Sequence, residues 1–160
     1  MYKFGCALLL GALAWPMGAR TANAVELATQ PVLTLAAARQ VAQAAEEKAR
    51  TSGWPGVIAV ADSAGLPILL IRMDGAAVPA GVELAPGKAR TAALFRRATG
   101  ALEDAVNGQR PAAITARGFV LMRGGLPIVV DGQTVGAIGV SADTPQHDEE
   151  IARAGVAALR

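Results

Sequence analysis

The chain has 160 residues with a formal net charge of +2, and 52% of its side chains are hydrophobic although only 4% are aromatic. Lys3 and Arg20 fall in an N-terminal segment that we expect to be removed; without them the 15 basic residues become 13, equal to the 13 acidic ones. This balance leaves no positive surface typical of nucleic-acid binding. Cys6 is the single cysteine and lies in the same segment, which excludes thiolate catalysis and cysteine metal sites from the rest of the chain.

Residues 1–24 have the pattern of a secretory signal peptide. Lys3 gives a positive start, residues 7–15 form an apolar core too short for a comfortable membrane span, and Ala22-Asn23-Ala24 is a small-residue cleavage site. The sequence therefore predicts cleavage after Ala24, export by the general secretory route, and a periplasmic or extracellular protein with no membrane span after cleavage. The alternative is an uncleaved N-terminal anchor.

Residues 25–160 fit a single domain in which helical and strand patterns alternate. In the first half of the domain we expect a loose leader at 25–31, a helix between Thr34 and Gly53, strands at 57–61 and 66–73, and a loop at 74–81. A helix follows around 88–95, and Pro86 either begins or kinks it. The second half is expected to contain a short helix at 99–106, irregular chain at 109–116, a third strand at 119–122, a hairpin within 124–141 and a last helix at 146–159.

The hairpin at 124–141 is the most informative stretch. Two apolar runs flank Asp131-Gly132, a dipeptide that supplies the positive φ angles of a tight turn. Gly136 and Gly139 interrupt the second run, and glycine weakens a strand unless another surface must approach its backbone. We therefore expect a helix, a ligand or a partner subunit to cover one face. Thr144-Pro145 follows as the N-cap and first residue of the last helix.

Five largely antiparallel strands with helices at both ends of the chain predict an α+β fold. The hairpin, together with the segments Arg-Met-Asp-Gly-Ala at 72–76 and Lys-Ala-Arg-Thr-Ala at 88–92, resembles the GlcG/HbpS-like family of haem-binding and haem-degrading domains from about residue 33 to residue 159. The resemblance implies a profilin-like fold, with an approximately five-stranded sheet flanked by helices, that assembles into homo-oligomeric dimers or larger rings. It also implies haem as cofactor. Family members are associated with glycolate and diol utilisation, which makes a small carboxylic acid the alternative ligand.

His147 is the only histidine of the chain and therefore the first candidate for a ligand to haem iron. It falls in the first turn of the last helix, where the helix dipole favours the neutral imidazole that binds iron. The alternative is a solvated histidine beside acidic neighbours. Relatives often have glutamine here, so their haem geometry does not transfer to this residue. Met73 and Met122 are further soft ligand candidates, with core filling as the alternative role.

A second set of residues could bind a carboxylate. Lysine and threonine of the 88–92 segment belong to a recurrent motif near the presumed pocket of the family, and the double glycine before the hairpin could offer backbone N–H groups. Each also has a structural alternative: a helix-surface lysine, a packed threonine, a turn-capping aspartate, or a simple glycine turn. The ligand-binding candidates are Arg72, Asp74, Lys88, Thr91, Gly124 and Gly125.

Catalytic side chains are scarce. Ser52, Ser63 and Ser141 are the serines after residue 24, none in a nucleophile-elbow pattern, and no P-loop or dinucleotide fingerprint occurs. We expect no protein-borne catalytic apparatus, and any haem breakdown would be chemistry of the iron itself. The sequence thus predicts an exported haem- or tetrapyrrole-binding protein for scavenging, storage or sensing. The alternatives are a hydroxy-acid-binding accessory protein or enzyme of glycolate- or diol-type metabolism, and an oligomeric scaffold without ligand.

Overall fold

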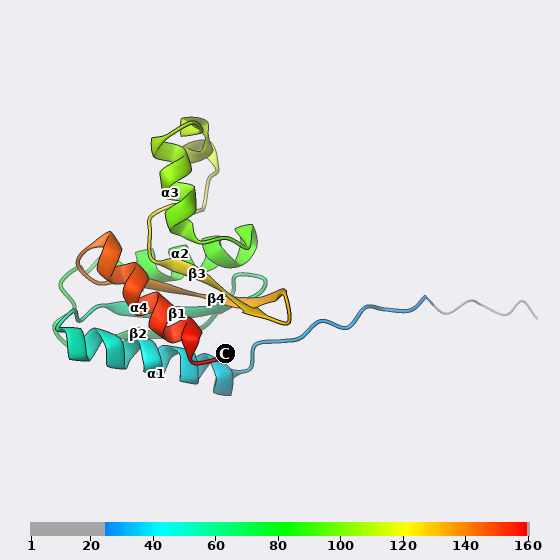
Figure 1. Cartoon of the computed structure of the whole chain (residues 1–160), viewed down its shortest axis with the longest axis horizontal. Helices are drawn as coiled ribbons and strands as arrows, with labels where there is room; N and C mark the ends of the chain where they lie inside the picture. Colours follow the sequence, from blue (N-terminus) through cyan, green and yellow to red (C-terminus); the bar gives the residue numbers. More distant parts are fainter. Residues whose placement is uncertain (1–24, 160) are drawn as a thin grey trace, which may run out of the picture.

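The computed structural model describes residues 25–159 as an α+β domain in which helices cover both faces of one sheet (Figure 1). The predicted signal peptide lies outside the described residues. Between residues 25 and 159, no helix is long and apolar enough to cross a membrane. The elements in chain order are α1 (Leu35–Ser52), β1 (Val57–Asp62), β2 (Pro67–Arg72), α2 (Gly81–Phe95), α3 (Thr99–Asn107), the 3-10 helix η1 (Pro111–Thr115), β3 (Gly125–Val130), β4 (Gln133–Ser141) and α4 (Pro145–Ala157).

The sheet has the strand order β2-β1-β4-β3, and every neighbouring pair in it is antiparallel. The hairpin between β3 and β4 turns at Asp131 and Gly132, whose φ angles of 48° and 75° confirm the predicted tight turn. Thr34 caps α1 and Thr144 caps α4, each accepting from a backbone N–H of the first helical turn, also as predicted.

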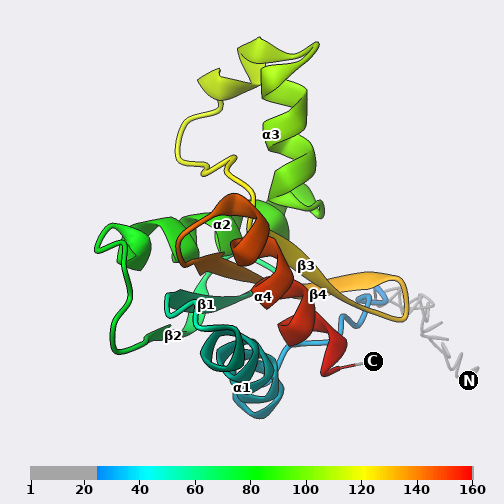
Figure 2. The same cartoon turned by 60° about the vertical axis from the view of Figure 1, so that its left-hand side comes forward.

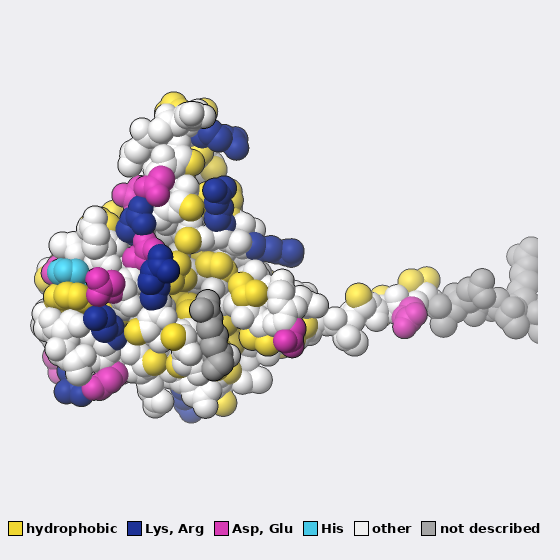
Figure 3. All heavy atoms as spheres, in the orientation of Figure 1, with side chains coloured by type: hydrophobic (Ala, Val, Ile, Leu, Met, Phe, Trp, Pro, Cys, Tyr) yellow, Lys and Arg dark blue, Asp and Glu magenta, His cyan; other side chains and the backbone are white. Residues whose placement is uncertain are grey.

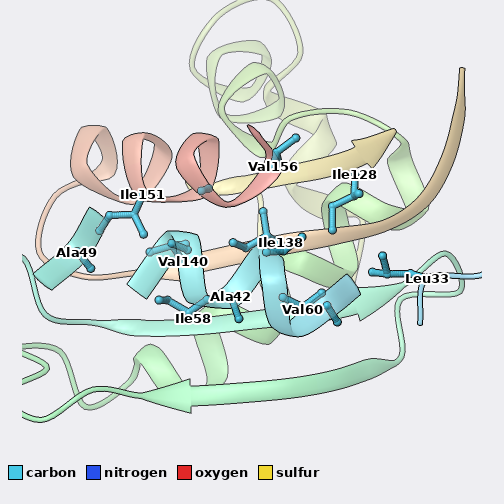
Figure 4. Packing of buried hydrophobic residues seen from close by; sticks show 14 of the residues in the cluster. Leu33, Ala42, Ala49, Ile58, Val60, Ile128, Ile138, Val140, Ile151 and Val156 are labelled. Carbon is cyan, nitrogen blue, oxygen red and sulfur yellow. The ribbon is translucent and has the colours of Figure 1, made fainter. Parts of the chain in front are cut away.

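The main core lies between the sheet and a layer formed by α1 and α4, which run side by side (Figures 1 and 2). Alternation along the strands directs Ile58 and Val60 of β1, and Ile138 and Val140 of β4, toward this layer (Figure 4). Ile151 of α4 completes the contact from the other side (Figure 4). Large β-branched residues therefore fill this half of the domain.

The opposite face is built from small side chains, and α2 lies directly on it. Ala59 of β1 and Ala137 of β4 are buried here, as is Ala85 of α2. A Cβ on Gly139 would overlap the carbonyl oxygen of Ala85 and lie 2.5 Å from the amide nitrogen of Ala89. Glycine at position 139 is thus required by the close approach of a helix, one of the three covers predicted for this hairpin.

The sequence did not predict the protrusion formed by residues 96–124. These residues leave the body of the domain and return to it, so that α3 and η1 stand clear of the sheet (Figures 1 and 2). Arg123 anchors this protrusion, since its guanidinium contacts Asp104 of α3 at 2.8 Å and Glu149 of α4 at 2.5 Å. Its planar group lies against Gly100, where a Cβ would come within 2.6 Å of the guanidinium nitrogen.

The predicted strand at 119–122 is wrong: the sheet of the described chain has four strands, not five. In place of a strand partner, the backbone N–H of Val120 donates to the hydroxyl oxygen of Thr91 at 2.9 Å. The apolar residues at 119–122 line the base of the protrusion, which explains why their pattern resembled that of a strand. The α+β class itself is confirmed.

Candidate functional site

Lys88 and Asp148 form an ion pair inside the protein. The side chain of Lys88 is 2% exposed and that of Asp148 is 8% exposed. The ammonium donates to Asp148 Oδ2 at 2.6 Å and to the carbonyl oxygen of Val140 at 2.9 Å. The second carboxylate oxygen, Oδ1, accepts from the backbone N–H of Ala142 at 2.6 Å. The pair therefore joins α2, the end of β4 and the first turn of α4.

The electrostatics of this pair reflect its burial. Burial raises the pKa of Asp148, while the Lys88 ammonium and the Ala142 N–H act in the opposite direction. Gly124 packs directly against the ion pair and has a φ of 114°. A Cβ there would come within 2.7 Å of the Asp148 Cβ. A residue with a side chain would be strained at this φ and would also press on the ion pair.

Thr91, Thr99 and Gly125 belong to the same buried region and are satisfied by internal hydrogen bonds. The Thr91 hydroxyl donates to the carbonyl oxygen of Gly87 at 2.7 Å while accepting from Val120. Thr99 accepts from the Gly125 N–H at 2.8 Å. Sequence reasoning missed Thr99, and only the return of the protrusion to β3 brings it opposite Gly125.

The structure thus brings together four of the six predicted ligand-binding residues, namely Lys88, Thr91, Gly124 and Gly125, but in a closed arrangement whose polar groups bind one another. Asp148, the partner of Lys88, was not among the predicted site residues. Its spacing carries no signal, because 60 residues separate it from Lys88 along the chain. A ligand role for these residues stays a prediction.

Arg72 and Asp74 are not part of this cluster. Both are exposed; Arg72 is the last residue of β2, an edge strand of the sheet, and Asp74 lies just beyond it. β2 ends at Arg72, so the strand alternation that would place both side chains on one face does not extend to Asp74. Asp74 instead lies in a turn before Gly75, whose φ is 77°. This position suits the turn-forming alternative.

His147 lies at the surface, where it is the cyan side chain of Figure 3, and its ring is held from two sides. Its Nδ1 lies 2.8 Å from a carboxylate oxygen of Asp143, and the ring stacks on Trp54 with centroids 3.6 Å apart and an interplanar angle of 7°. Burial raises the pKa of Asp143, but the hydrogen bonds from His147 and Thr144 outweigh it, so the pKa is lowered overall.

This arrangement leaves Nε2 as the ring nitrogen that could bind a metal, with a carboxylate behind it as in many metal-binding histidines. Asp143 precedes His147 by four residues, a spacing that could have indicated the contact in advance. Trp54 could not be paired with it from sequence. Within residues 25–159, no group of three or more histidine, cysteine or acidic side chains could hold a metal ion by itself.

An apolar groove of about 410 Å³ lies where the protrusion meets α2, and no sequence pattern pointed to it. Its volume falls within the range of small-molecule sites. Its walls come from four separate segments, namely α2, α3, η1 and residues 119–122, which explains why the sequence alone did not reveal it. The lining residues are Leu84, Glu103, Val106, Asn107, Ile114, Phe119, Val120, Leu121 and Met122.

Comparison with known proteins places this fold in a family. The family described as haem degrading protein HbpS-like matches residues 33–157, which is most of the chain. The chain belongs to the HbpS-like family. The sequence-based resemblance to GlcG/HbpS-like domains is thereby confirmed, and the matched residues lie within the range of about 33–159 over which the resemblance was seen.

The sequence of this HbpS-like chain is 43% identical to protein GlcG of Escherichia coli strain K12 over 113 residues, which cover 71% of the chain and 84% of GlcG. Among solved structures, a double mutant of Streptomyces reticuli HbpS superposes with a TM-score of 0.79 at 35% identity, covering 88% of this chain and 95% of that one. A PduOC:haem complex superposes with a TM-score of 0.71 at 30% identity, covering 80% of this chain and 95% of that one.

Proposed function

We propose that this HbpS-like chain is an exported protein that binds haem, for scavenging, storage or sensing. Family membership and similarity to the PduOC:haem complex support the ligand, and the signal-peptide pattern of residues 1–24 supports export to the periplasm or the exterior. The observation that carries the proposal is the apolar groove at the base of the protrusion, because a flat hydrophobic macrocycle needs an apolar surface of this size.

The donor set of the described residues fits haem. Iron in haem is commonly held by imidazole or thioether, and the chain presents one of each outside its core: the Nε2 of His147 and the sulfur of Met122. The predicted ligand His147 has its ring fixed by Asp143 and Trp54, which suits coordination. Bound haem would supply peroxide-dependent iron chemistry, while the protein contributes binding, orientation and a dry apolar wall.

Self-association is part of the proposal. Ile114 is 72% exposed on η1, and Phe95 at the end of α2 is 42% exposed, so the protrusion and its base present large apolar side chains to solvent. Such side chains are typical of contact surfaces when they occur together. We expect a homo-oligomer, a dimer or a larger ring, which sedimentation velocity of the purified protein would measure.

The test is a hemin titration of protein expressed as the full chain in a secreting host and purified from the exported fraction. Intact mass reports whether cleavage follows Ala24. A saturable Soret band is expected, and its loss in a His147→Ala variant would make the imidazole the iron ligand. Saturable binding in both proteins would keep haem and exclude His147 as a required ligand. Shallow, unsaturable absorbance would refute haem binding and favour the small carboxylic acid, to be tested by thermal shift with short hydroxy acids.

A further inference from the structure

The two methionines of the described chain occupy opposite environments. Met73 packs against the main hydrophobic core, where it fills space as methionine usually does. Met122 is 49% exposed and lines the groove at the base of the protrusion. Core filling therefore accounts for Met73 and gives no reason for a thioether at position 122.

The remaining lining residues of the groove make Met122 its one soft donor. Seven of the nine lining side chains are apolar, counting Met122. The two polar ones are Asn107 and Glu103, and the carboxylate of Glu103 already accepts from the backbone N–H of Arg123 at 2.6 Å. Thioether sulfur binds haem iron but has little affinity for hard cations. The groove therefore combines an apolar surface that can contact the haem macrocycle with a side chain that can bind its iron.

We infer that haem is held in this groove, between α3, η1 and residues 119–122, with the sulfur of Met122 as a ligand to its iron; this inference rests on the proposed function. The backbone is held in place on both sides of Met122. Arg123, the next residue, forms ion pairs with α3 and α4, and the N–H of Val120, two residues before, is bonded to Thr91. This anchoring favours a defined position for the Met122 sulfur.

His147 is a separate site in this arrangement. It is not among the residues that line the groove, and its ring is stacked on Trp54. The two predicted ligand types can therefore be distinguished by single substitutions, and Met73 offers a matched methionine control.

Hemin is titrated into the protein, expressed as the full chain and purified from the exported fraction, and into its Met122→Leu, Met73→Leu and His147→Ala variants. Leucine keeps the volume and apolar character of methionine, so Met122→Leu removes little more than the sulfur. The readouts are Soret absorbance and the near-infrared charge-transfer band of thioether-ligated ferric haem. We expect the band in the wild-type protein and in the Met73→Leu and His147→Ala variants, and its loss in Met122→Leu. Far-UV circular dichroism verifies that each variant is folded.

Saturable hemin binding without a thioether band in the wild type, or with a band that survives in Met122→Leu, would overturn the inference and leave the proposed function standing. No saturable binding in the wild type would instead remove the proposed function itself. An Ile114→Asp variant tests the groove independently of the sulfur, because this exposed side chain can become charged without disturbing the core. Weaker hemin binding is expected. Unchanged hemin binding in this variant would overturn the inference, and a changed sedimentation coefficient beside it would show that the groove is a contact between copies.

Discussion

Replacing Asp148 by asparagine would leave the ammonium of Lys88 inside the protein without its counter-charge. At 2.6 Å the gross attraction of the two charges is on the order of 6 kcal/mol with an effective dielectric constant of about 20, and desolvation offsets part of it. Breaking such a buried pair from one side typically costs about 3–5 kcal/mol. For a domain of this size we expect a fall in Tm of roughly 10–20 °C.

A double variant separates the buried charge from the geometry around it. Lys88→Met combined with Asp148→Asn removes both charges while the asparagine oxygen can still accept from the N–H of Ala142. We expect the double variant to recover more than half of the stability lost in Asp148→Asn, since an apolar replacement of a buried pair is often close to neutral. Glu150→Gln, on the same helix but exposed, is the control and should change stability by less than about 0.5 kcal/mol.

Urea unfolding followed by circular dichroism measures these differences. A loss of less than about 1 kcal/mol in Asp148→Asn would mean that the site is not dry, contrary to the burial described above. A double variant as unstable as Asp148→Asn would show that the cost comes from the shape of the α4 start and not from an isolated charge.

Three further outcomes follow from single contacts. Gly139→Ala should lower the free energy of unfolding by about 1–3 kcal/mol, because its Cβ would displace α2, and a loss near zero in urea unfolding would contradict that packing. Thr99→Val should cost about 1–3 kcal/mol in the same assay, since it leaves a buried backbone N–H without its acceptor; a neutral result would mean that water replaces the hydroxyl. Burial raises the pKa of Glu149, but the hydrogen bonds from Arg123 and Arg153 lower it by more than burial raises it. The pKa in the folded protein therefore lies below that in the unfolded chain. This stabilisation is present above the unfolded pKa and is lost as the pH falls through the folded pKa, so Glu149→Gln should flatten the acid limb of a stability-against-pH curve, and an unchanged limb would contradict the assignment.

Predictions that depended on local contacts were the accurate ones. The caps Thr34 and Thr144, the stop at Gly53 and the turn at Asp131 were identified correctly because each depends on the φ angle or side chain of a residue and on neighbours within one turn. The segment at 119–122 was assigned incorrectly because an apolar run does not reveal whether a strand partner or a groove faces it.

The candidate site shows the same division. Lys88 and Thr91 were predicted as candidate ligand-binding residues, with a structural packing role as the alternative for each. The structure gives them internal partners, Asp148 and Val120, which lie 60 and 29 residues away along the chain. No periodicity encodes such pairings, because they arise when whole elements dock.

The amino-acid sequence by itself determined the order of most elements, the tight hairpin and the requirement for close cover at Gly139, since these depend on local dihedral angles and on the absence of a side chain. Only the tertiary structure decided that α2 provides that cover, that Lys88 is an internal ion-pair partner, and that Met122 lies in a groove while Met73 lies against the core. The physical reason is that burial and electrostatic pairing depend on which surfaces meet in space, and identical residue types acquire opposite roles according to what packs against them.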